Sequence, residues 1–566
     1  MTYTPPVADQ RFVLDHIARI GELAGHERFA EATPDLVDAI LEGAGEFAAG
    51  EFAPLNRTGD EVGAKWSAGG VAMPPGFREA YQAYVEGGWG TLAGPADHGG
   101  QGLPLVLATV VMEDLGAANM AFSLVTMLSA GAVEALRHHG SAEMQAQWLP
   151  KLVTGEWTGT MNLTEPQAGS DVGALKTRAE PAGDGTWRIK GQKIFITFGD
   201  HDLADNIVHL VLARTPGAPP GTKGISLFLV PKMLPDGTAN DLRCVSIEHK
   251  LGIHASPTCV MAFGDGGDCR GWLIGEEMAG MRAMFTMMNN ARLNVGLQGV
   301  SIGERATQAA IAYAAQRVQG VREGRPAAIV DHPDVRRMLL RMSALTQAAR
   351  ALCYYAAGQT DRGTLGDAAA QARADLLTPL VKAYGTDIGC EVASLGVQVH
   401  GGMGFVEETG AAQHYRDIRI SPIYEGTNGI QAADLVGRKL GLEGGEVLRR
   451  LLAEIRADSG EGALAGLADS AEGAAERLAA MGPDDRLAGS YPFLTLLSTL
   501  VCGWLMKRQL DALDSPEIAA DRRFSSRKRA ACLYYLDHVV PEAAGLAAQA
   551  TAGAALFYPE EPLFGG

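Results

Sequence analysis

The spacing of apolar residues changes twice along the chain. Over residues 1–150 they recur at helical intervals, most clearly at Met112–His138, and Gly140 is placed to end that helix. From about residue 155 to 275 the pattern becomes short apolar runs of strand length. Long helical periods return from Glu276 to Lys439 and continue toward the C-terminus. The predicted order is therefore helical, β, helical and again helical.

Three runs in the middle segment are predicted to be strands. Trp187–Thr197 follows a Gly-Asp-Gly turn at 183–185, as the second strand of a hairpin would. Asn206–Arg214 and Gly224–Lys232 are rich in Ile, Val, Leu and Phe and lie between Pro/Gly loops. Their intervals predict a compact antiparallel barrel or sandwich.

Outside this segment the pattern predicts helices and four domains. The clearest helical segments are Met281–Arg317, Pro333–Gly358, Glu446–Asp458, Leu467–Met481 and Arg529–Ala555. The domains expected are residues 1–155 (helical, with an N-terminal preface), 156–275 (β), 276–440 (a helical bundle) and 441–566 (a helical extension). The extension is too large and too apolar to be a tail.

Two features bear on the compartment. The longest apolar stretch, Tyr491–Met506, is too short and too often interrupted for a membrane span, so a buried helix is predicted and no stable membrane insertion. The N-terminus lacks the pattern of a signal peptide, and the seven cysteines are scattered without a Cys-x-x-Cys pair. A reducing, cytoplasmic location without a structural metal is expected.

Charge bears on the kind of partner. The net charge is −18 and the sequence pI about 5.2, so the chain lacks the electrostatic footprint of a nucleic-acid-binding protein. One basic run, Arg522–Arg529, stands out. A solvated helix face is the expected interpretation, and contact with phosphate or a membrane is the alternative.

One carboxylate is a candidate base. Residues 421–431 read Ser-Pro-Ile-Tyr-Glu-Gly-Thr-Asn-Gly-Ile-Gln, which places Glu425 before a turn-forming Gly426. Isoleucines at 418, 420, 423 and 430 flank it, which predicts a carboxylate at the wall of a dry pocket. Burial raises the pKa of a carboxyl group and makes it a better base. The alternative is that Glu-Gly-Thr only caps a helix.

A second segment, Met161-Asn-Leu-Thr-Glu-Pro-Gln-Ala-Gly-Ser-Asp171, is a Pro/Gly loop with hydroxyls and exposed N–H groups that suit a polar ring edge or a phosphate. Together the two segments resemble those of the acyl-CoA dehydrogenase family. The resemblance covers roughly residues 75–440, and with the extension it is strongest to the C-terminally extended bacterial branch that includes 3-methylmercaptopropionyl-CoA dehydrogenases. It implies a multidomain α+β fold: an N-terminal helical domain, a central β-barrel, a C-terminal four-helix bundle and an extra helical domain.

The family's reaction is the expectation for this chain. The resemblance implies FAD-dependent α,β-dehydrogenation of an acyl-CoA thioester to a trans-2-enoyl-CoA, with Glu425 removing the Cα proton and FAD taking hydride from Cβ. It implies 3-methylthiopropionyl-CoA or a medium- or long-chain acyl-CoA as substrate, an electron-transferring flavoprotein as acceptor, and a homodimer. The alternatives are an acyl-CoA oxidase and the non-catalytic, DNA-associated flavoproteins of the same superfamily.

The resemblance also implies the residues of the site, Glu425 being the catalytic one. Expected flavin contacts are Met161, Leu163, Thr164, Gly169, Ser170, Phe195, Ile196, Thr197, Arg317 (on the partner's flavin), Gln398, His400, Gly401, Gly402, Thr427 and Asn428. Expected substrate contacts are Ser170, Asn289, Arg292, Tyr424 and Gly426.

Several positions depart from the family's pattern, among them Phe198, which follows Thr197 where Asn is often found. Phe195 stands where Trp is common, and Asn289 stands where Asp is frequent. His254 replaces a common Arg and is expected to be a surface or turn histidine. Ala291 occupies the position at which some branches carry their catalytic Glu, which leaves Glu425 without a rival there.

Overall fold

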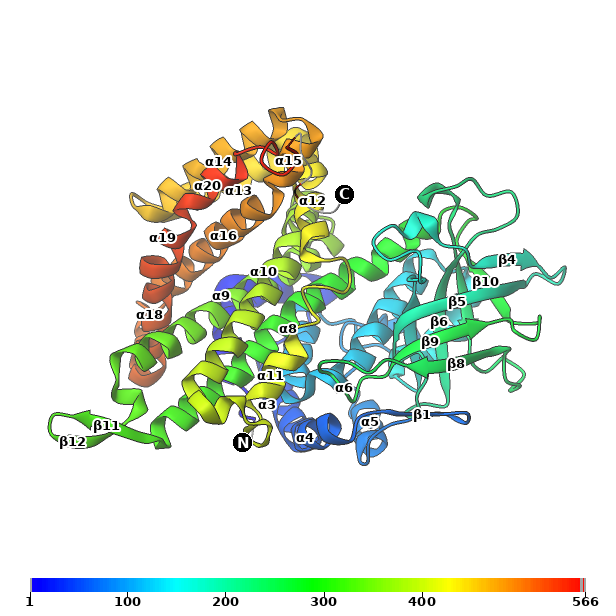
Figure 1. Ribbon diagram of the computed structural model, residues 1–566, viewed down its shortest axis with the longest axis horizontal. Coiled ribbons are helices and arrows are strands. Elements are labelled where there is room, and N and C mark those ends of the chain that lie inside the picture. Colours follow the sequence, from blue (N-terminus) through cyan, green and yellow to red (C-terminus); the bar gives the residue numbers. More distant parts are fainter. Residues whose placement is uncertain (1–2, 560–562, 564–566) are drawn as a thin grey trace. The chain divides into compact units, whose positions relative to one another are not determined.

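The computed structural model describes residues 3–559 and 563, and the chain forms two compact units (Figure 1). The sheet unit comprises residues 43–291. The bundle unit comprises residues 3–42 together with the chain from residue 292 onward. The chain passes between them within α3 (Pro34–Phe47) and within the long helix α8 (Gly280–Gln316). The N-terminal preface and the C-terminal extension therefore belong to one unit.

The sheet unit begins with helices α4 (Ala53–Val62), α5 (Phe77–Glu86), α6 (Leu105–His139) and α7 (Ala142–Thr154). The predicted helix at Met112–His138 is confirmed within α6, and Gly140 ends it as expected. Among the described residues α6 is the one helix long and apolar enough to cross a membrane, and 83% of its most apolar window is buried inside the protein. Helix α6 contains a break at Asn119 (φ −158°, ψ 90°), where the Asn119 side chain accepts from the Phe122 N–H at 3.2 Å.

Eight strands form one continuous sheet, in the order β3-β6-β7-β10-β5-β9-β8 with β4 beside β5. The strands are β3 (Trp157–Asn162), β4 (Arg178–Pro181), β5 (Trp187–Thr197), β6 (Asn206–Ala213), β7 (Ser226–Pro231), β8 (Leu242–Ile247), β9 (Thr258–Phe263) and β10 (Arg270–Ile274). All three predicted strands are confirmed. The expected purely antiparallel arrangement is wrong at one pair, because β3 and β6 run parallel. They are far apart along the chain, so no hairpin fixes their direction.

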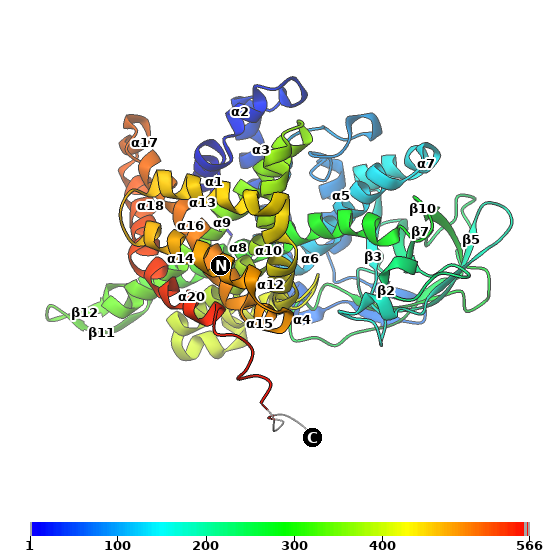
Figure 2. The ribbon, with the colours of Figure 1, turned by 90° about the horizontal axis from the view of Figure 1, so that it is seen from above.

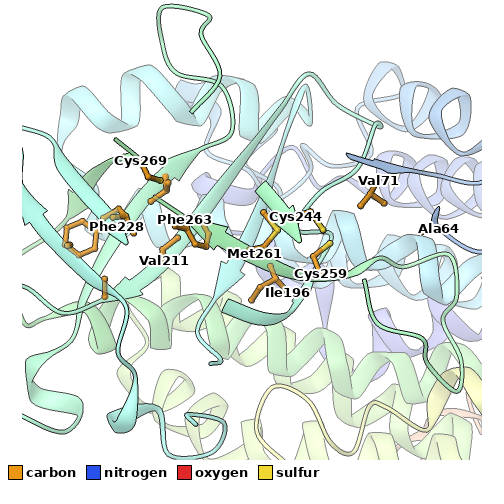
Figure 3. Close-up of a cluster of buried hydrophobic side chains, with 14 residues drawn as sticks. Ala64, Val71, Ile196, Val211, Phe228, Cys244, Cys259, Met261, Phe263 and Cys269 are labelled. Carbon is orange, nitrogen blue, oxygen red and sulfur yellow. The ribbon is translucent and has the colours of Figure 1, made fainter. Parts of the chain in front are cut away.

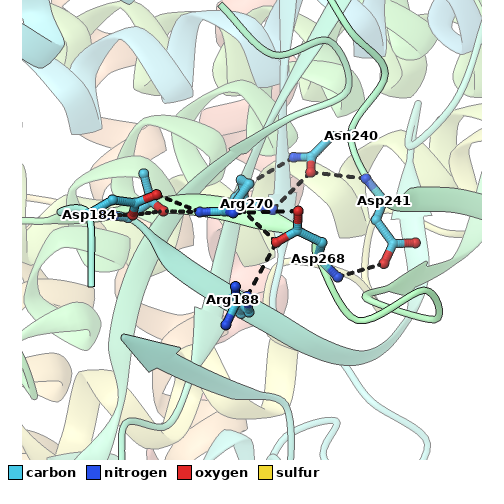
Figure 4. Close-up of polar contacts among 7 residues, drawn as sticks. Asp184, Arg188, Asn240, Asp241, Asp268 and Arg270 are labelled. Carbon is cyan, nitrogen blue, oxygen red and sulfur yellow. Dashed lines mark hydrogen bonds and ion pairs between the residues drawn. The ribbon is translucent and has the colours of Figure 1, made fainter. Parts of the chain in front are cut away.

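The sheet unit has an apolar core and a polar rim. Phe228, Met261 and Phe263, from β7 and β9, lie in one buried cluster (Figure 3). At the rim, Arg270 contacts Asp184 and Asp268, each at 2.7 Å (Figure 4). These carboxylates are exposed, so the ion pairs add little to stability. They hold the 183–185 turn against β10.

The bundle unit is built on α8, α9 (Pro333–Thr364) and α10 (Ala368–His400), followed by α11 (Ala411–Ile418) and α12 (Asn428–Gly437). A hairpin of β11 (Val318–Arg322) and β12 (Arg325–Ala328) follows α8. The extension adds α13 (Glu446–Ser459), α14 (Ala463–Ala480), α15 (Pro483–Ala488), α16 (Ser490–Ala512), α17 (Pro516–Ala520), α18 (Arg522–Tyr534), α19 (Val540–Glu542) and α20 (Leu546–Ala550). Helix α16 packs on α9, α10 and α12, and α13 and α14 lie beside it (Figure 2).

The extension confirms three predictions and corrects two. Helices α13, α14 and the buried α16 occur where the pattern places them. The single helix expected over Arg529–Ala555 is wrong, since this segment divides into α18, a π-turn, α19 and α20. Pro541 supports the division, because it cannot donate a helical hydrogen bond. The basic run is not a wholly solvated face, because Lys528 is 1% exposed and pairs with Asp9 at 3.0 Å.

Candidate functional site

Residues 421–428 form a strained turn that presents Glu425. Glu425 has φ +55° and Gly426 has φ +83°, so two consecutive residues are left-handed. This conformation is unusual for any residue with a side chain, and such strain is concentrated at functional positions. The isoleucines expected to form the wall of a dry pocket are not all buried. Ile418 is buried, but Ile423 and Ile430 are 49% and 42% exposed.

The turn is anchored on both sides of Glu425. The Tyr424 hydroxyl donates to Gln298 Oε1 on α8, and Ser421 Oγ donates to the same oxygen at 3.0 Å. Thr427 caps α12, because its Oγ1 accepts from the Ile430 N–H at 3.2 Å. The capping role therefore belongs to Thr427, and the Glu425 carboxylate is not the cap.

Two cations of the bundle unit act on Glu425. Burial raises the pKa of Glu425 to about 7, although Arg292 and Lys382 oppose this rise. Arg292 is only 5% exposed, and its Nε lacks a hydrogen-bond partner in the described part of the chain. The predicted substrate arginine is thus also an electrostatic neighbour of the carboxylate. A carboxyl group with a pKa near 7 exchanges protons readily at neutral pH.

Lys382 was not found from the sequence. It is fully buried on α10, and burial lowers its pKa to about 7 against the opposing effects of Glu425 and Asp387. Its Nζ donates to Asn428 Oδ1 at 2.9 Å, and Asn428 Nδ2 donates to Asp387 Oδ1 at 2.8 Å. The available signal was a lone lysine within an apolar helix, because lysine is almost never buried without a partner. The amide of Asn428, a predicted flavin contact, is therefore engaged inside the bundle unit.

In the sheet unit, a buried ion pair fastens the loop that follows β3, residues 163–171, to β5. Lys193 Nζ donates to Glu165 Oε1 at 2.8 Å and to the Leu163 carbonyl at 3.0 Å. Burial opposes ionisation of Glu165, but Lys193 and the hydrogen bonds from Thr177 and Lys176 lower its pKa to about 2. The sequence reasoning missed the role of this pair.

Several groups of this loop and of the neighbouring Phe195 segment remain accessible to solvent. The Thr164 carbonyl accepts from the Ile194 N–H at 2.9 Å, which places Thr164 beside the start of the Phe195 segment. Phe195 has φ +60° and is 59% exposed, so it is not a core side chain. Gly169 and Ser170 are exposed as well.

The predicted site residues are divided between the two units. The sheet unit holds Met161, Leu163, Thr164, Gly169, Ser170, Phe195, Ile196, Thr197 and Asn289. The bundle unit holds Arg292, Arg317, Gln398, His400, Gly401, Gly402, Tyr424, Glu425, Gly426, Thr427 and Asn428.

Among the expected flavin contacts of the bundle unit, Arg317 and Gln398 are exposed. His400 is buried and stacks on Tyr313 with ring centroids 4.4 Å apart. In the sheet unit His254 lies in a turn, as expected; it is half-buried, and its Nδ1 lies 2.9 Å from Asp60 Oδ1.

Comparisons with known proteins agree on one family. Its sequence profiles match residues 35–156 (acyl-CoA dehydrogenase, N-terminal domain), 160–265 (middle domain) and 278–440 (C-terminal domain), and an acetyl-CoA dehydrogenase C-terminal-like profile matches 446–558. The chain is 47% identical to 3-methylmercaptopropionyl-CoA dehydrogenase from Ruegeria pomeroyi, covering 89% of this chain and 90% of that protein.

Two further comparisons cover nearly the whole chain. A broad-specificity linear acyl-CoA dehydrogenase, FadE5, from Mycobacterium tuberculosis is 33% identical, covering 95% of this chain and 96% of the relative. The crystal structure of an acyl-CoA dehydrogenase complexed with FAD from Bacillus anthracis superposes with a TM-score of 0.76 at 22% identity, covering 95% of this chain and 94% of that chain. The chain therefore belongs to the acyl-CoA dehydrogenase family and is an FAD-dependent oxidoreductase.

Proposed function

We propose that the protein converts an acyl-CoA thioester to its trans-2-enoyl-CoA, with Glu425 as the base. The observation that carries this is the Glu425 turn, where a strained backbone and two cations meet at one half-buried carboxyl group. A capping role for Glu425 does not account for these features, because the helix cap is supplied by Thr427.

The residues of the sheet unit fit FAD. An exposed aromatic at positive φ beside Thr164 offers a flat apolar surface next to polar groups, as a planar polar ring requires. A side-chain atom added at Gly169 would meet nothing within 4 Å, so this part of the loop is open to a ligand. We propose that Thr164, Ser170, Phe195 and Thr197 hold the flavin. When bound, FAD supplies the acceptor for the hydride that leaves Cβ.

The residues of the bundle unit supply the proton chemistry. Glu425 Oε takes the Cα proton, and a pKa near 7 leaves about half of the molecules in the basic form at neutral pH. Arg292 and Lys382 favour that ionised form. The Glu425 N–H is the proposed donor to the thioester carbonyl, and one such donor contributes ~2.7–4 kcal/mol to the transition state. Gly426 permits the turn that aims it.

The preferred substrate is proposed to be 3-methylthiopropionyl-CoA. The support is the 47% identity over nine-tenths of the relative that carries this activity in its name. The relative named as a broad-specificity linear acyl-CoA dehydrogenase, at 33% identity, supports other linear acyl-CoAs as the second candidates. An acyl-CoA oxidase is the alternative reaction, and turnover that consumes O₂ in place of a dye or flavoprotein acceptor would identify it.

Glu425→Gln tests the chemistry. The amide keeps the shape and removes the base, so the variant should retain FAD and bind acyl-CoA while losing at least 10²-fold in flavin reduction. The wild-type rate should rise with pH through about 7, as the base ionises. A panel of acyl-CoAs from C4 to C18 plus 3-methylthiopropionyl-CoA, with a dye acceptor, identifies the substrate. Substantial turnover by the variant would place the base elsewhere.

We also propose an electron-transferring flavoprotein as acceptor and a homodimer as the assembly. Arg317 is exposed at the start of the β11–β12 hairpin, which suits a contact with a second copy. The net charge of −18 argues against the DNA-associated flavoproteins. Sedimentation of the flavin-loaded protein measures the assembly, and a monomer with full flavin would contradict it.

A further inference from the structure

A chain of hydrogen bonds runs from the C-terminal extension to the cation beside Glu425. Tyr491, in the first turn of α16, donates its hydroxyl to Asp387 Oδ2 at 2.6 Å. The other oxygen of Asp387 accepts from Asn428 Nδ2 at 2.8 Å, and Asn428 Oδ1 accepts from Lys382 Nζ at 2.9 Å. Asn428 begins α12, three residues after Glu425. The chain of hydrogen bonds starts on α16, passes to Asp387 on α10 and Asn428 on α12, and returns to α10 at Lys382.

The chemistry of the end groups fixes the direction of the chain. A lysine ammonium can only donate, and an ionised carboxylate can only accept. The Asn428 amide must therefore turn its oxygen to Lys382 and its nitrogen to Asp387. Asn428 Nδ2 also donates to the Ala383 carbonyl at 3.1 Å, which holds the amide in this orientation. Asn428 therefore links Asp387 directly to the Lys382 ammonium.

Charge couples the same residues. The charged neighbours of Asp387 are Lys382 and Arg419. The charged neighbours of Lys382 are Glu425, Asp387 and Arg292. The charged neighbours of Glu425 are Arg292 and Lys382. Burial raises the pKa of Asp387, and the hydrogen bonds from Tyr491 and Asn428 oppose that rise. Without the Tyr491 hydroxyl, Asp387 is neutral more often and supports the Lys382 ammonium less. Glu425 then loses part of the attraction that keeps it ionised, so its pKa rises.

We propose that Tyr491 is a positioning residue of the reaction, which acts through Asp387 and Asn428 to hold the Lys382 ammonium in place beside Glu425. The C-terminal extension is thereby a working part of the active site and not only a cover for the bundle. This inference rests on the proposed role of Glu425 as base.

The test is Tyr491→Phe in the full-length, FAD-loaded enzyme, with Tyr558→Phe as matched control. Both changes remove one hydroxyl from the extension, and Tyr558 is 71% exposed. We expect Tyr491→Phe to raise the midpoint of the acid limb of the pH–rate profile for flavin reduction by about 0.5 pH unit. Below the midpoint the rate should therefore fall about threefold, and KM should stay unchanged. Tyr558→Phe should match the wild type.

Two further measurements separate this role from a structural one. The first is an infrared pH titration of the substrate-free holoenzyme, in which the difference between wild type and Glu425→Gln reports the protonation of Glu425 without turnover. Tyr491→Phe should raise the midpoint of this titration by the same amount as it raises the midpoint of the rate. Asp387→Asn should shift the midpoint in the same direction, and the double variant no further than Asp387→Asn alone. An unmoved midpoint in Tyr491→Phe, with or without lower stability, would overturn the proposal. Residual turnover in Glu425→Gln would instead contradict the base assignment, while the titration still reports on the network.

Discussion

Glu425 sets a conflict between stability and reactivity at a single residue. Its pKa rises from an ordinary 4.5 to about 7 on folding, because burial outweighs the attraction of Arg292 and Lys382. A group whose folded pKa is raised contributes stability that is present below its unfolded pKa and lost as the pH rises through the folded pKa. Above pH 7 the ionised Glu425 therefore lowers the free energy of unfolding of the ligand-free protein. Below about pH 4.5 the group is protonated in both the folded and the unfolded state, so this loss is absent.

This predicts a pH-dependent gain in stability from Glu425→Gln. The neutral amide should stabilise the protein by about 1–3 kcal/mol at pH 8 and by nothing at pH 4.5, relative to wild type. Thermal unfolding of both proteins across this range measures the difference. Glu461→Gln, at an exposed position, is the control and should show no such trend. A constant difference across the range would contradict the raised pKa.

At the same scale, the sequence was sufficient to single out Glu425 as the candidate base but not to find its electrostatic neighbours. Glu425 lies in a contiguous segment, so its neighbours along the chain could be read directly. Lys382 and Asp387 lie about forty residues earlier on α10, and their effect depends on how α10 and α12 pack. Lys193 and Glu165 were missed for the same reason, since a loop and a strand contribute one residue each.

At the scale of elements, local signals predicted what local structure decides. Trp187–Thr197 was found with its observed bounds because a glycine turn and continuous strand periodicity mark it. The parallel pairing of β3 and β6 and the division of residues 529–555 depend on tertiary neighbours, and the periodicity does not record them. The turn before α12 was predicted only in part. Gly426 indicated one residue with positive φ, and the structure has two, Glu425 and Gly426.

Gly426→Ala tests that turn. A Cβ at this position would lie 2.9 Å from Gln431 Nε2, and the φ of +83° is strained for alanine, so we expect a loss of about 1–3 kcal/mol. Displacing Glu425 should also lower flavin reduction by about 10-fold or more. Gly429→Ala is the control, because its Cβ would meet nothing closer than Thr427 Oγ1 at 3.7 Å. Equal behaviour of the two variants would show that the left-handed turn is dispensable.

At the scale of the whole chain, the extension is integrated into the bundle unit. Arg373 of α10 binds Glu454 of α13 at 2.7 Å, and Arg341 of α9 binds Glu542 of α19 at 2.7 Å. Tyr384 of α10 and Tyr535 share a buried hydrogen bond of 2.9 Å. Composition predicted a packed helical domain, but these pairings between distant segments have no signature in the sequence.

Deleting everything after Leu440 should therefore make the protein aggregate. The apolar side of α16 that the deletion removes is wholly buried at Leu494, Leu496, Leu497, Leu500, Val501, Trp504 and Leu505, so the surfaces of α9, α10 and α12 that it covers would become exposed. Exposed apolar patches beyond a few hundred Å² drive association. Arg373 and Arg341 would also lose their partners on α13 and α19.

Light scattering and sedimentation measure the outcome of this deletion. Removal of residues 556–566 alone is the control, because this segment begins with three exposed side chains, and the shortened protein should stay soluble. A soluble, fully active protein ending at Leu440 would show that the extension is an independent module, and Tyr491 would then have no part in the reaction.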